Sequence, residues 1–381
     1  MKRLMLALGA VLLLGVSSAQ ALVQRAYVSA LTGNDSNTAT DCAATAPCRW
    51  FAGAISVVAS GGEIVAMDSG AYGALTITKS ISIIAAPGVY AGITVFAGNG
   101  VTIATPGVNV VLRGLTINGL GGAYGIDMTA GSSLAVENCA ISNMSGRGLS
   151  VATGAKIRVL DSVFTNNGTV GVRMQGSVQG SISGTRIFGS TTALDLSAST
   201  SEETSVLVEN STVSDAVQAG VTVTATGTGT ARLTLRNTSV SRSGWEGVVA
   251  QADGGTVEIQ AIHSLSFDNA FQGFYALATT SGTARMDIRD SVSHSNSMGV
   301  YIQGTTGTAR GSISNTVVAD NAYGLRVYGV GGTLSASGNV VMRNGTGMSQ
   351  ASSGVFYSAG NNLLEGNATP TLGTIGAISF Q

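Results

Sequence analysis

Charged residues are scarce in this chain of 381 residues, where 19 basic and 20 acidic side chains make up only 10% of the sequence. A net charge of −1 argues against nucleic-acid binding, which depends on basic patches that neutralise phosphates. The two histidines, His263 and His294, fall at different places in the repeat described below. We therefore expect neither a histidine metal site nor a Ser-His-Asp relay.

Long apolar runs are lacking after the N-terminus, so no membrane span is expected in the mature chain. Residues 1–21 combine a basic start at Lys2 and Arg3, an apolar stretch and a small-x-small end at Ala19-Gln20-Ala21. This pattern is typical of a secretory signal peptide. It predicts cleavage after Ala21 and a secreted or periplasmic bacterial protein.

Cysteine is rare, with three residues in the chain. Cys42 and Cys48 enclose a short loop in an exported protein, which predicts a disulfide between them. A metal pair is the alternative, but no further Cys or His lies near them. Cys139 occupies a place where other repeats carry Ser or Thr, so we expect a buried, unreactive thiol.

Proline occurs only 4 times, whereas glycine occurs 53 times and apolar residues make up 44% of the chain. The regular recurrence of apolar residues is not typical of a disordered protein. Abundant Thr, Ser, Val and Ile suit many short strands that are joined by tight turns.

One short phrase, a small residue followed by an apolar–any–apolar triplet, occurs ten times at intervals of 22 to 27 residues. The phrases begin at Gly125, Gly148, Gly171, Ala193, Gly220, Gly247, Gly273, Gly299, Gly324 and Gly347. An alternating strand follows each phrase, and then an Asn/Asp–Ser/Thr/Cys step, such as Asp290-Ser291, leads into a third strand. Three strands per repeat without helical periodicity predict a solenoid of stacked triangular coils, with Asn and Ser/Thr bonded up the stack at the turns. The frame of leucine-rich repeats is absent, and propeller blades need about 40 residues.

The repeat divides the chain into four parts. Residues 1–21 are the signal peptide, and residues 22–75 form an N-terminal cap with the disulfide loop and an apolar helix at Trp50–Ala59. Residues 76–348 form the solenoid, and residues 349–381 form the last coil and a C-terminal cap. A cap is expected because a stack of coils has an open apolar end. The predicted fold is an all-β solenoid of about 11–13 coils with a short capping helix.

The opening segment and the coils resemble a known family. After the apolar helix come Gly61-Gly62-Glu63-Ile64, Gly70-Ala71-Tyr72-Gly73 and Ile77-Thr78-Lys79-Ser80-Ile81. In these features the chain resembles exported bacterial proteins with a right-handed parallel β-helix of the pectin-lyase-like architecture. The resemblance implies that fold but no single activity, since members include polysaccharide lyases, glycoside hydrolases, adhesins and phage tailspikes. The Gly-His-Gly and Arg-x-Lys motifs of the galacturonan hydrolases of this fold are absent, so no catalytic residue is carried over.

The register of the repeat sorts outward side chains into columns with a spacing of about 4.8 Å. On the first strand of each coil, it places Tyr275, Tyr301 and Arg326 on consecutive coils. Sugar rings bind aromatic strips through their apolar faces, so these are the predicted ligand-binding residues for a polysaccharide or cell-surface glycan. The alternative is cross-coil packing that only stabilises the sheet.

On the second strand, the register places Glu258 and Asp287 in one column, with Arg236 and Arg289 diagonal to them and Gln260 in the column of the arginines. Two carboxylates about 5 Å apart repel unless a cation or a raised pKa relieves them. If the protein is an enzyme, Glu258, Asp287 and Arg289 are the predicted catalytic residues of a polysaccharide lyase or glycoside hydrolase acting on a uronate-type polysaccharide. Calcium is a possible cofactor only for the lyase, and otherwise no cofactor or metal is expected. The simpler interpretation is a charge ladder on a solvated face.

The coils lack long insertions, since their lengths differ by at most five residues and the longest candidate, Ser197–Thr204, reads as an extended turn. A smooth rod favours binding or display over catalysis in a deep cleft. We therefore predict an exported, monomeric and non-catalytic scaffold that binds, or is displayed on, extracellular polysaccharide or the cell surface. The lyase or hydrolase is the alternative.

Overall fold

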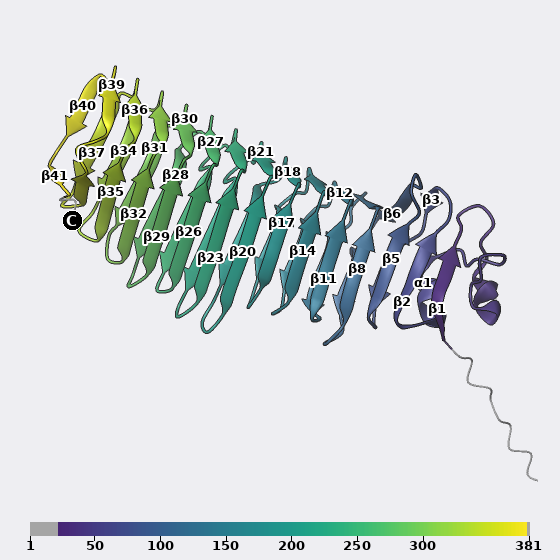
Figure 1. The fold of residues 1–381 in the computed structure, drawn as a ribbon. Helices are drawn as coiled ribbons and strands as arrows, with labels where there is room; N and C mark the ends of the chain where they lie inside the picture. Colours follow the sequence, from purple (N-terminus) through teal and green to yellow (C-terminus); the bar gives the residue numbers. More distant parts are fainter. Residues whose placement is uncertain (1–21, 379–381) are drawn as a thin grey trace, which may run out of the picture.

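The computed structural model describes residues 22–378, most of which lie in short parallel strands stacked along one axis (Figure 1). The predicted signal peptide lies outside the described residues. Three sheets run the length of the stack, and we number them by their order within a coil. Sheet 1 has 13 strands from β4 (Leu75–Ile77) to β40 (Thr369–Leu372), and sheet 2 has 15 from β1 (Val23–Val28) to β41 (Ile375–Ala377). Sheet 3 has 13 strands, from β3 (Gly70–Ala71) to β39 (Leu363–Glu365).

Each turn of the chain contributes one strand to each sheet. One coil consists of β10 (Tyr124–Ala130) in sheet 1, β11 (Ser133–Glu137) in sheet 2 and β12 (Ala140–Ser142) in sheet 3. In sheet 1, Ile126 pairs with Leu149 of the next coil, and both side chains are buried. About 12 such turns confirm the predicted all-β solenoid.

The small residue of each phrase makes room for a buried side chain of the next coil. A Cβ atom on Gly299 would lie 2.9 Å from Nδ2 of Asn321 and 2.8 Å from the carbonyl oxygen of Gly324. Equivalent contacts surround Gly273. The requirement for a small residue, which the sequence shows but does not explain, therefore comes from close packing against the backbone of the next coil and, at Gly273 and Gly299, also against a buried polar turn.

That turn contains a buried asparagine ladder between sheet 3 and sheet 1. Its members each bond the next one up the stack: Asn269, Asn296, Asn321, Asn344 and Asn367. The backbone N–H of each of the first four also donates to the side-chain oxygen of the next. The ladder satisfies backbone groups that the coil buries at its corner.

A second ladder of hydroxyls lies at the turn between sheet 2 and sheet 3. The backbone N–H of Ser264 donates to Oγ of Ser291 (3.1 Å), and that of Ser291 donates to Oγ1 of Thr316 (3.3 Å). The preceding residue adopts the left-handed conformation, as at Asp290 (φ 51°), which Asn and Asp tolerate. The predicted stacking of polar residues at the turns is confirmed here, whereas the asparagine ladder at the other corner was not predicted.

The N-terminal segment begins the stack rather than only covering it. β1 pairs in parallel with β2 (Val58–Ala66) and so forms the first strand of sheet 2, which the sequence did not predict. The predicted disulfide between Cys42 and Cys48 is formed. The backbone N–H of Cys48 donates to the carbonyl oxygen of Tyr27, so the disulfide loop is fastened to β1.

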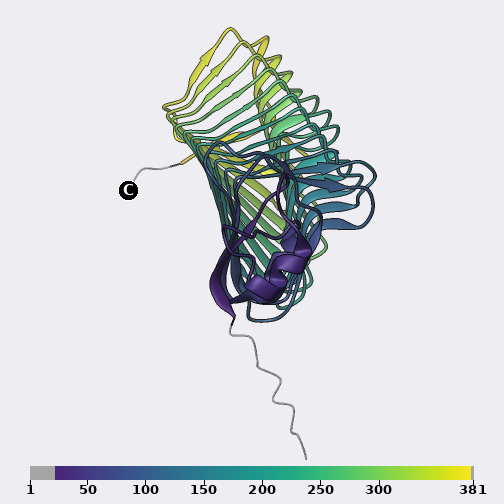
Figure 2. The same cartoon turned by 90° about the vertical axis from the view of Figure 1, so that its right-hand side faces the viewer.

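Helix α1 (Phe51–Val57) follows the disulfide loop and lies across the N-terminal end of the stack (Figure 2). It buries Phe51 and Ala54, and the Phe51 ring packs 5.0 Å from that of Tyr72. The helix is shorter than predicted because Val58 already begins β2. The helix packs against β1 and β2 of the first coil, and the 3-10 helix η1 (Asp35–Thr40) packs against the helix.

Coil corners divide two segments whose recurring apolar residues favour a single strand in each. Residues 76–83 divide between β4 and β5 (Ile81–Ala85). Residues 110–117 divide between β8 (Asn109–Arg113) and β9 (Leu115–Gly119), with Gly114 at φ +73° between them. At each corner two neighbouring residues, Lys79–Ser80 and Arg113–Gly114, lie outside the core, so the alternation of buried and outward residues is interrupted there.

Cys139 is free and buried in the core, and burial raises the pKa of its thiol to about 11. This environment is that of the unreactive thiol that the sequence predicted. His263 lies in a turn with φ 50°, whereas His294 ends β30 (Val292–His294) and its ring stacks on Phe267. The histidines therefore occupy different places in their coils, as predicted. Among residues 22–378, no helix is long and apolar enough to cross a membrane.

Candidate functional site

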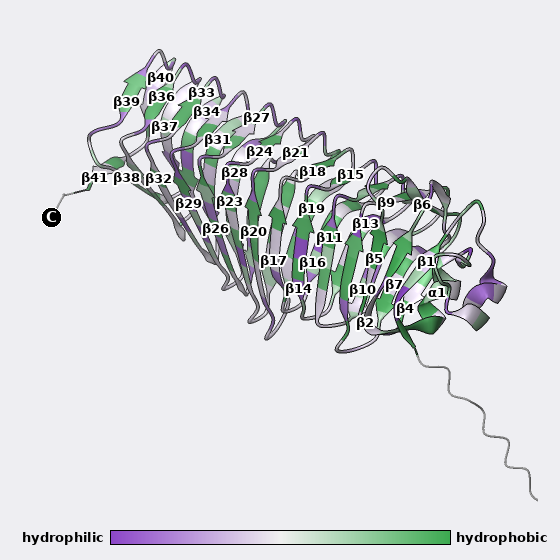
Figure 3. Cartoon of the chain, turned by 45° about the vertical axis from the view of Figure 1, so that its right-hand side comes forward, coloured by the Kyte–Doolittle hydropathy of each residue, from purple (hydrophilic) through white to green (hydrophobic). Residues whose placement is uncertain are grey.

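The outward column on sheet 1 is aligned as the sequence predicted. Its residues, one per coil, are Asp127, Ser150, Arg173, Asp195, Thr222, Val249, Tyr275, Tyr301 and Arg326. They lie on β10, β13 (Arg147–Ala152), β16 (Val170–Gln175), β19 (Thr192–Ala198), β22 (Val221–Thr226), β25 (Val248–Asp253), β28 (Gln272–Thr279), β31 (Met298–Gly304) and β34 (Tyr323–Tyr328). Figure 3 shows these strands side by side on one face of the rod.

Tyr275 and Tyr301 stack directly on each other. Their ring centroids are 5.2 Å apart and their planes differ by 6°, and the Arg326 guanidinium lies 5.6 Å from the Tyr301 centroid. Tyr301 is only 9% exposed. The facing surfaces of these rings are therefore used for packing between coils, and a sugar would meet mainly ring edges and hydroxyls.

Burial keeps the hydroxyls of both tyrosines protonated. The Tyr275 hydroxyl donates to Oε1 of Gln303 at 2.7 Å. Burial raises the pKa of Tyr275, and the nearby Tyr301 and Glu246 raise it further. Burial also raises the pKa of Tyr301, although Arg326 opposes this. Both hydroxyls thus remain protonated donors near neutral pH.

Further aromatic residues, which the repeat pattern does not mark, lie on sheet 1 and at the turns that lead into it. Arg326 also lies over the ring of Tyr323, 4.6 Å from its centroid. Trp245 and Phe271 are 48% and 49% exposed at the turns that lead into sheet 1. The backbone N–H of Phe271 donates to the carbonyl oxygen of Trp245 (3.0 Å), which places them on neighbouring coils. We call Trp245 and Phe271 the aromatic edge. The sequence signal was an aromatic residue two positions before the glycine of successive phrases.

A polar segment occupies the same column nearer the N-terminus. Nε of Arg173 lies 3.4 Å from Oδ2 of Asp195, whose side chain is 19% exposed. Burial raises the pKa of Asp195, although Arg173 and then Arg147 oppose this. Arg147 donates to Oγ of Ser150 at 3.2 Å. The Arg173–Asp195 pair is therefore more enclosed than an ordinary surface ion pair.

The predicted carboxylate column on sheet 2 is wrong. Glu258 pairs in register with Arg285, whereas Asp287 pairs with Gln260, so the two carboxylates do not follow one another. The predicted flanking column is also shifted, because Arg236 pairs with Ile262 and not with Gln260.

The error has a simple cause in β26 (Thr256–Ile262). Val257, Ile259 and Ala261 are all buried, so a shift of two residues leaves the inward and outward pattern unchanged. The prediction aligned Val257 and Ile259 with the buried pair of the neighbouring strand, whereas the structure aligns Ile259 and Ala261 with it. Glu258 was therefore assigned to the column that Gln260 occupies. Unlike sheet 1, this strand has no glycine that marks one position.

Glu258 is held by two arginines rather than placed beside a second carboxylate. Arg232 Nε donates to it at 2.9 Å and Arg285 Nη1 at 2.7 Å. Burial alone would raise the pKa of Glu258, but these bonds outweigh it and lower the pKa. Burial raises the pKa of Asp287, opposed by Arg289 and reinforced by Glu258. Glu258 is therefore part of a series of alternating charges on a solvated face, as the simpler interpretation predicted. Its lowered pKa is the opposite of what a general acid needs.

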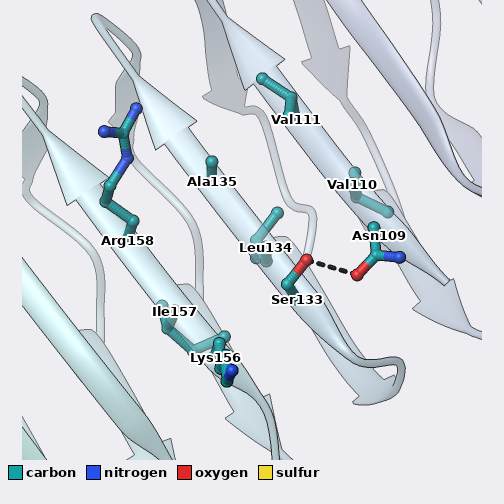
Figure 4. A pocket seen from close by; sticks show the side chains of 9 residues that line it. All are labelled: Asn109, Val110, Val111, Ser133, Leu134, Ala135, Lys156, Ile157 and Arg158. Atoms are coloured by element: carbon teal, nitrogen blue, oxygen red, sulfur yellow. Dashed lines mark hydrogen bonds between the residues drawn. The ribbon is translucent and has the colours of Figure 1, made fainter. Parts of the chain in front are cut away.

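Shallow hollows occur on the outer surface of sheet 2. Figure 4 shows one of about 210 Å³, where the hydrogen-bonded pair Asn109–Ser133 and the long Arg158 surround the small Ala135. This volume is below the about 300 Å³ at which ligand sites usually begin. A hollow of about 530 Å³ lies farther along, around Arg310. Within residues 22–378, no three His, Cys, Asp or Glu side chains gather as a metal site would require.

Comparison with known proteins agrees with this architecture. Residues 91–258 match the family described as "Right handed beta helix region". The chain is a right-handed parallel β-helix. No curated protein matches the sequence of this β-helix.

Two solved structures illustrate the similarity. The A-module of Azotobacter vinelandii mannuronan C-5 epimerase AlgE6 is 14% identical, with 84% of this chain and 91% of that chain covered and a TM-score of 0.54. The catalytic unit of the thermostable GH87 alpha-1,3-glucanase from Streptomyces thermodiastaticus strain HF3-3 is 13% identical, with 93% and 69% covered and a TM-score of 0.57. At these identities the similarity shows the fold alone.

Proposed function

We propose that this β-helix binds a polysaccharide outside the cytoplasm, as a monomeric and non-catalytic protein, through the aromatic edge and the neighbouring surface of sheet 1. The observation that carries the proposal is the exposure of Trp245 and Phe271, two large aromatic side chains that each keep about half of their surface in water. Aromatic rings bind sugars through their apolar faces, and clustered exposed aromatics are typical of binding surfaces.

The geometry of the stack suits a linear polymer. Side chains on successive coils are spaced by about 4.8 Å, so a glycan lying along the axis would contact one coil after another. The edges and hydroxyls of Tyr275 and Tyr301, with the guanidinium of Arg326, would supply polar contacts beside the aromatic edge. The two structural neighbours are named for activity on mannuronan and alpha-1,3-glucan, which supports a polysaccharide as the ligand class.

The test is the double variant Trp245→Ala/Phe271→Ala in affinity electrophoresis through gels that contain neutral or acidic polysaccharides. We expect affinity to fall about 30-fold or more, because two aromatic side chains that a ligand covers contribute about 2 kcal/mol or more together. Phe96→Ala is the matched control, since Phe96 is an exposed aromatic far from this surface and its loss should leave retardation unchanged. The proposal fails if the wild-type protein is retarded by no polysaccharide, or if the double variant is retarded equally.

A second candidate function is catalysis on a polysaccharide, and the enclosed Asp195 favours it. A carboxyl with a raised pKa between two arginines has the properties of a general acid or base. The assay incubates alginate, polygalacturonate and alpha-1,3-glucan with the protein, with added calcium or with a chelator, since calcium is the cofactor that a lyase would need.

Reducing ends, unsaturated products and altered sugar configuration are measured after incubation. If the protein is an enzyme, Asp195→Asn should lower the rate at least about 100-fold, whereas Asp161→Asn, in an exposed turn, should not. No product from any of these polymers would rule out catalysis on them and leave the binding proposal intact.

A further inference from the structure

A series of ion pairs runs along one outward column of sheet 2 and does not include Arg310, the last arginine of that column. Arg232 contacts both Glu203 and Glu258, and Glu258 contacts Arg285. The next residue in that column is Arg310, on β32 (Thr308–Ser314), paired directly with Arg285 of β29 (Thr283–Arg289). Two like charges on neighbouring strands are unfavourable unless a counter-charge joins them.

No side chain within residues 22–378 supplies that counter-charge to Arg310 through an ion pair. The residue after it in the column is Thr333 of β35 (Gly332–Ser337), which is uncharged. Among residues 22–378, the exposed Arg310 guanidinium takes part in no ion pair, whereas Arg285 retains Glu258. The surface therefore presents a guanidinium that is free to bind an external anion.

A hollow of about 530 Å³ opens beside Arg310, within the usual size range of ligand sites. Its floor is formed by Ser312 and Ser335, small residues that occupy the column between Asp287 and Tyr357. Tyr357, on β38 (Val355–Ser358), closes the C-terminal side and is 40% exposed. The shape thus follows from two small side chains between two larger ones.

The charges in the hollow favour an anion at its arginine side. Arg285 is already paired with Glu258, whereas Arg310 is unpaired among the described side chains. Asp287, the carboxylate that lines the hollow, lies in the neighbouring column. An anion would therefore be placed toward Arg310 and the Thr333 hydroxyl, away from Asp287. Planar guanidinium groups bind carboxylate and sulfate oxygens in pairs, and the Tyr357 ring offers an apolar face and a hydroxyl to an adjoining sugar.

We propose that this hollow on sheet 2 is a second binding site, specific for the carboxylate or sulfate groups of an acidic polysaccharide, with Arg310 as its principal ligand. The site is separate from the aromatic edge, which lies at the border of sheet 1. Binding at the hollow can therefore be tested separately from binding at the aromatic edge.

The experiment measures affinity for polygalacturonate, which carries only carboxylates, for dextran sulfate, which carries only sulfates, and for neutral dextran. It uses the wild-type protein, Arg310→Ala and Arg310→Lys, each also in the Trp245→Ala/Phe271→Ala background. We expect Arg310→Ala to weaken binding of one or both acidic polymers about tenfold, since one charge-assisted contact is lost. Arg310→Lys should lose less because it keeps the charge but not the paired donors.

Arg236→Ala is the matched control, because Arg236 is an exposed arginine on the same sheet but outside the hollow. It should bind the acidic polymers as the wild type does. The inference is overturned if neither acidic polymer binds in the double-variant background, if Arg310→Ala binds as tightly as its parent, or if Arg236→Ala weakens binding equally. Preference for polygalacturonate or for dextran sulfate identifies which oxyanion the site takes.

Discussion

Replacing Gly299 with valine is expected to lower the free energy of unfolding by about 3 kcal/mol or more, because nothing around this position has room to move. Its Cβ would lie 2.5 Å from Cγ1 of Val318, in addition to its close approach to a backbone oxygen and a ladder amide. Moving the amide would break the hydrogen bonds of Asn321, and moving the backbone would break the strand pairing of sheet 1.

Urea denaturation followed by circular dichroism measures this effect. Gly154→Val is the control, since Gly154 is exposed and the nearest atom to its added Cβ lies at 3.4 Å. The control should change stability by no more than about 0.5 kcal/mol. Similar denaturation midpoints for the two variants would show that close packing against the ladder is not what demands a small residue.

The second large effect is expected from Asn321→Ala in the middle of the asparagine ladder. The side-chain oxygen of Asn321 accepts from the backbone N–H of Asn296 (2.9 Å), while Nδ2 donates to the carbonyl oxygen of Ser293 (3.3 Å) and to Oδ1 of Asn344 (3.0 Å). Truncation leaves these buried groups without partners. Each unsatisfied group costs about 1–3 kcal/mol, so we expect a total loss of about 3 kcal/mol.

The matched control is Asn109→Ala, which removes an exposed asparagine whose side chain makes one hydrogen bond, to Ser133. Its denaturation midpoint should stay close to that of the wild type. Hydrogen exchange adds a local measurement, because loss of Asn321 should expose the amide of Asn296 before distant coils respond. An unchanged exchange rate at Asn296 would contradict a role for the ladder in holding that corner.

The sequence predicted the architecture well because a small residue marks the same position in ten consecutive coils. From Gly125 to Gly347 the small residue, which is glycine in every phrase except the one at Ala193, lies in close contact with the next coil, so its spacing reports the true register, and the Tyr275–Tyr301–Arg326 alignment followed correctly. Sheet 2 has only alternating apolar residues, which any shift by two preserves, and the Glu258–Asp287 pairing failed for that reason.

The candidate site was predictable only in part. The repeat predicts which side chains lie next to each other on successive coils, but not how much of each side chain is exposed to solvent. Stacking of Tyr275 on Tyr301 covers their facing surfaces, and this could not be known before the side-chain orientations were seen. Trp245 and Phe271 lie outside the apolar triplet, in the turns, and the repeat pattern drew no attention to them. The hollow beside Arg310 depends on two serines aligned by the corrected register of sheet 2.

Because each turn of the chain adds one strand to every sheet, the reach of the rod is set by the number of coils. The 13 strands of sheet 1 extend over about 58 Å, and one more coil would add about 4.8 Å. A duplicated unit that carries its own glycine and asparagine would dock on its neighbours with the same contacts. Genes for such proteins can therefore lengthen by whole-coil duplication, which changes how many monomers of a polymer the rod spans without redesigning its core.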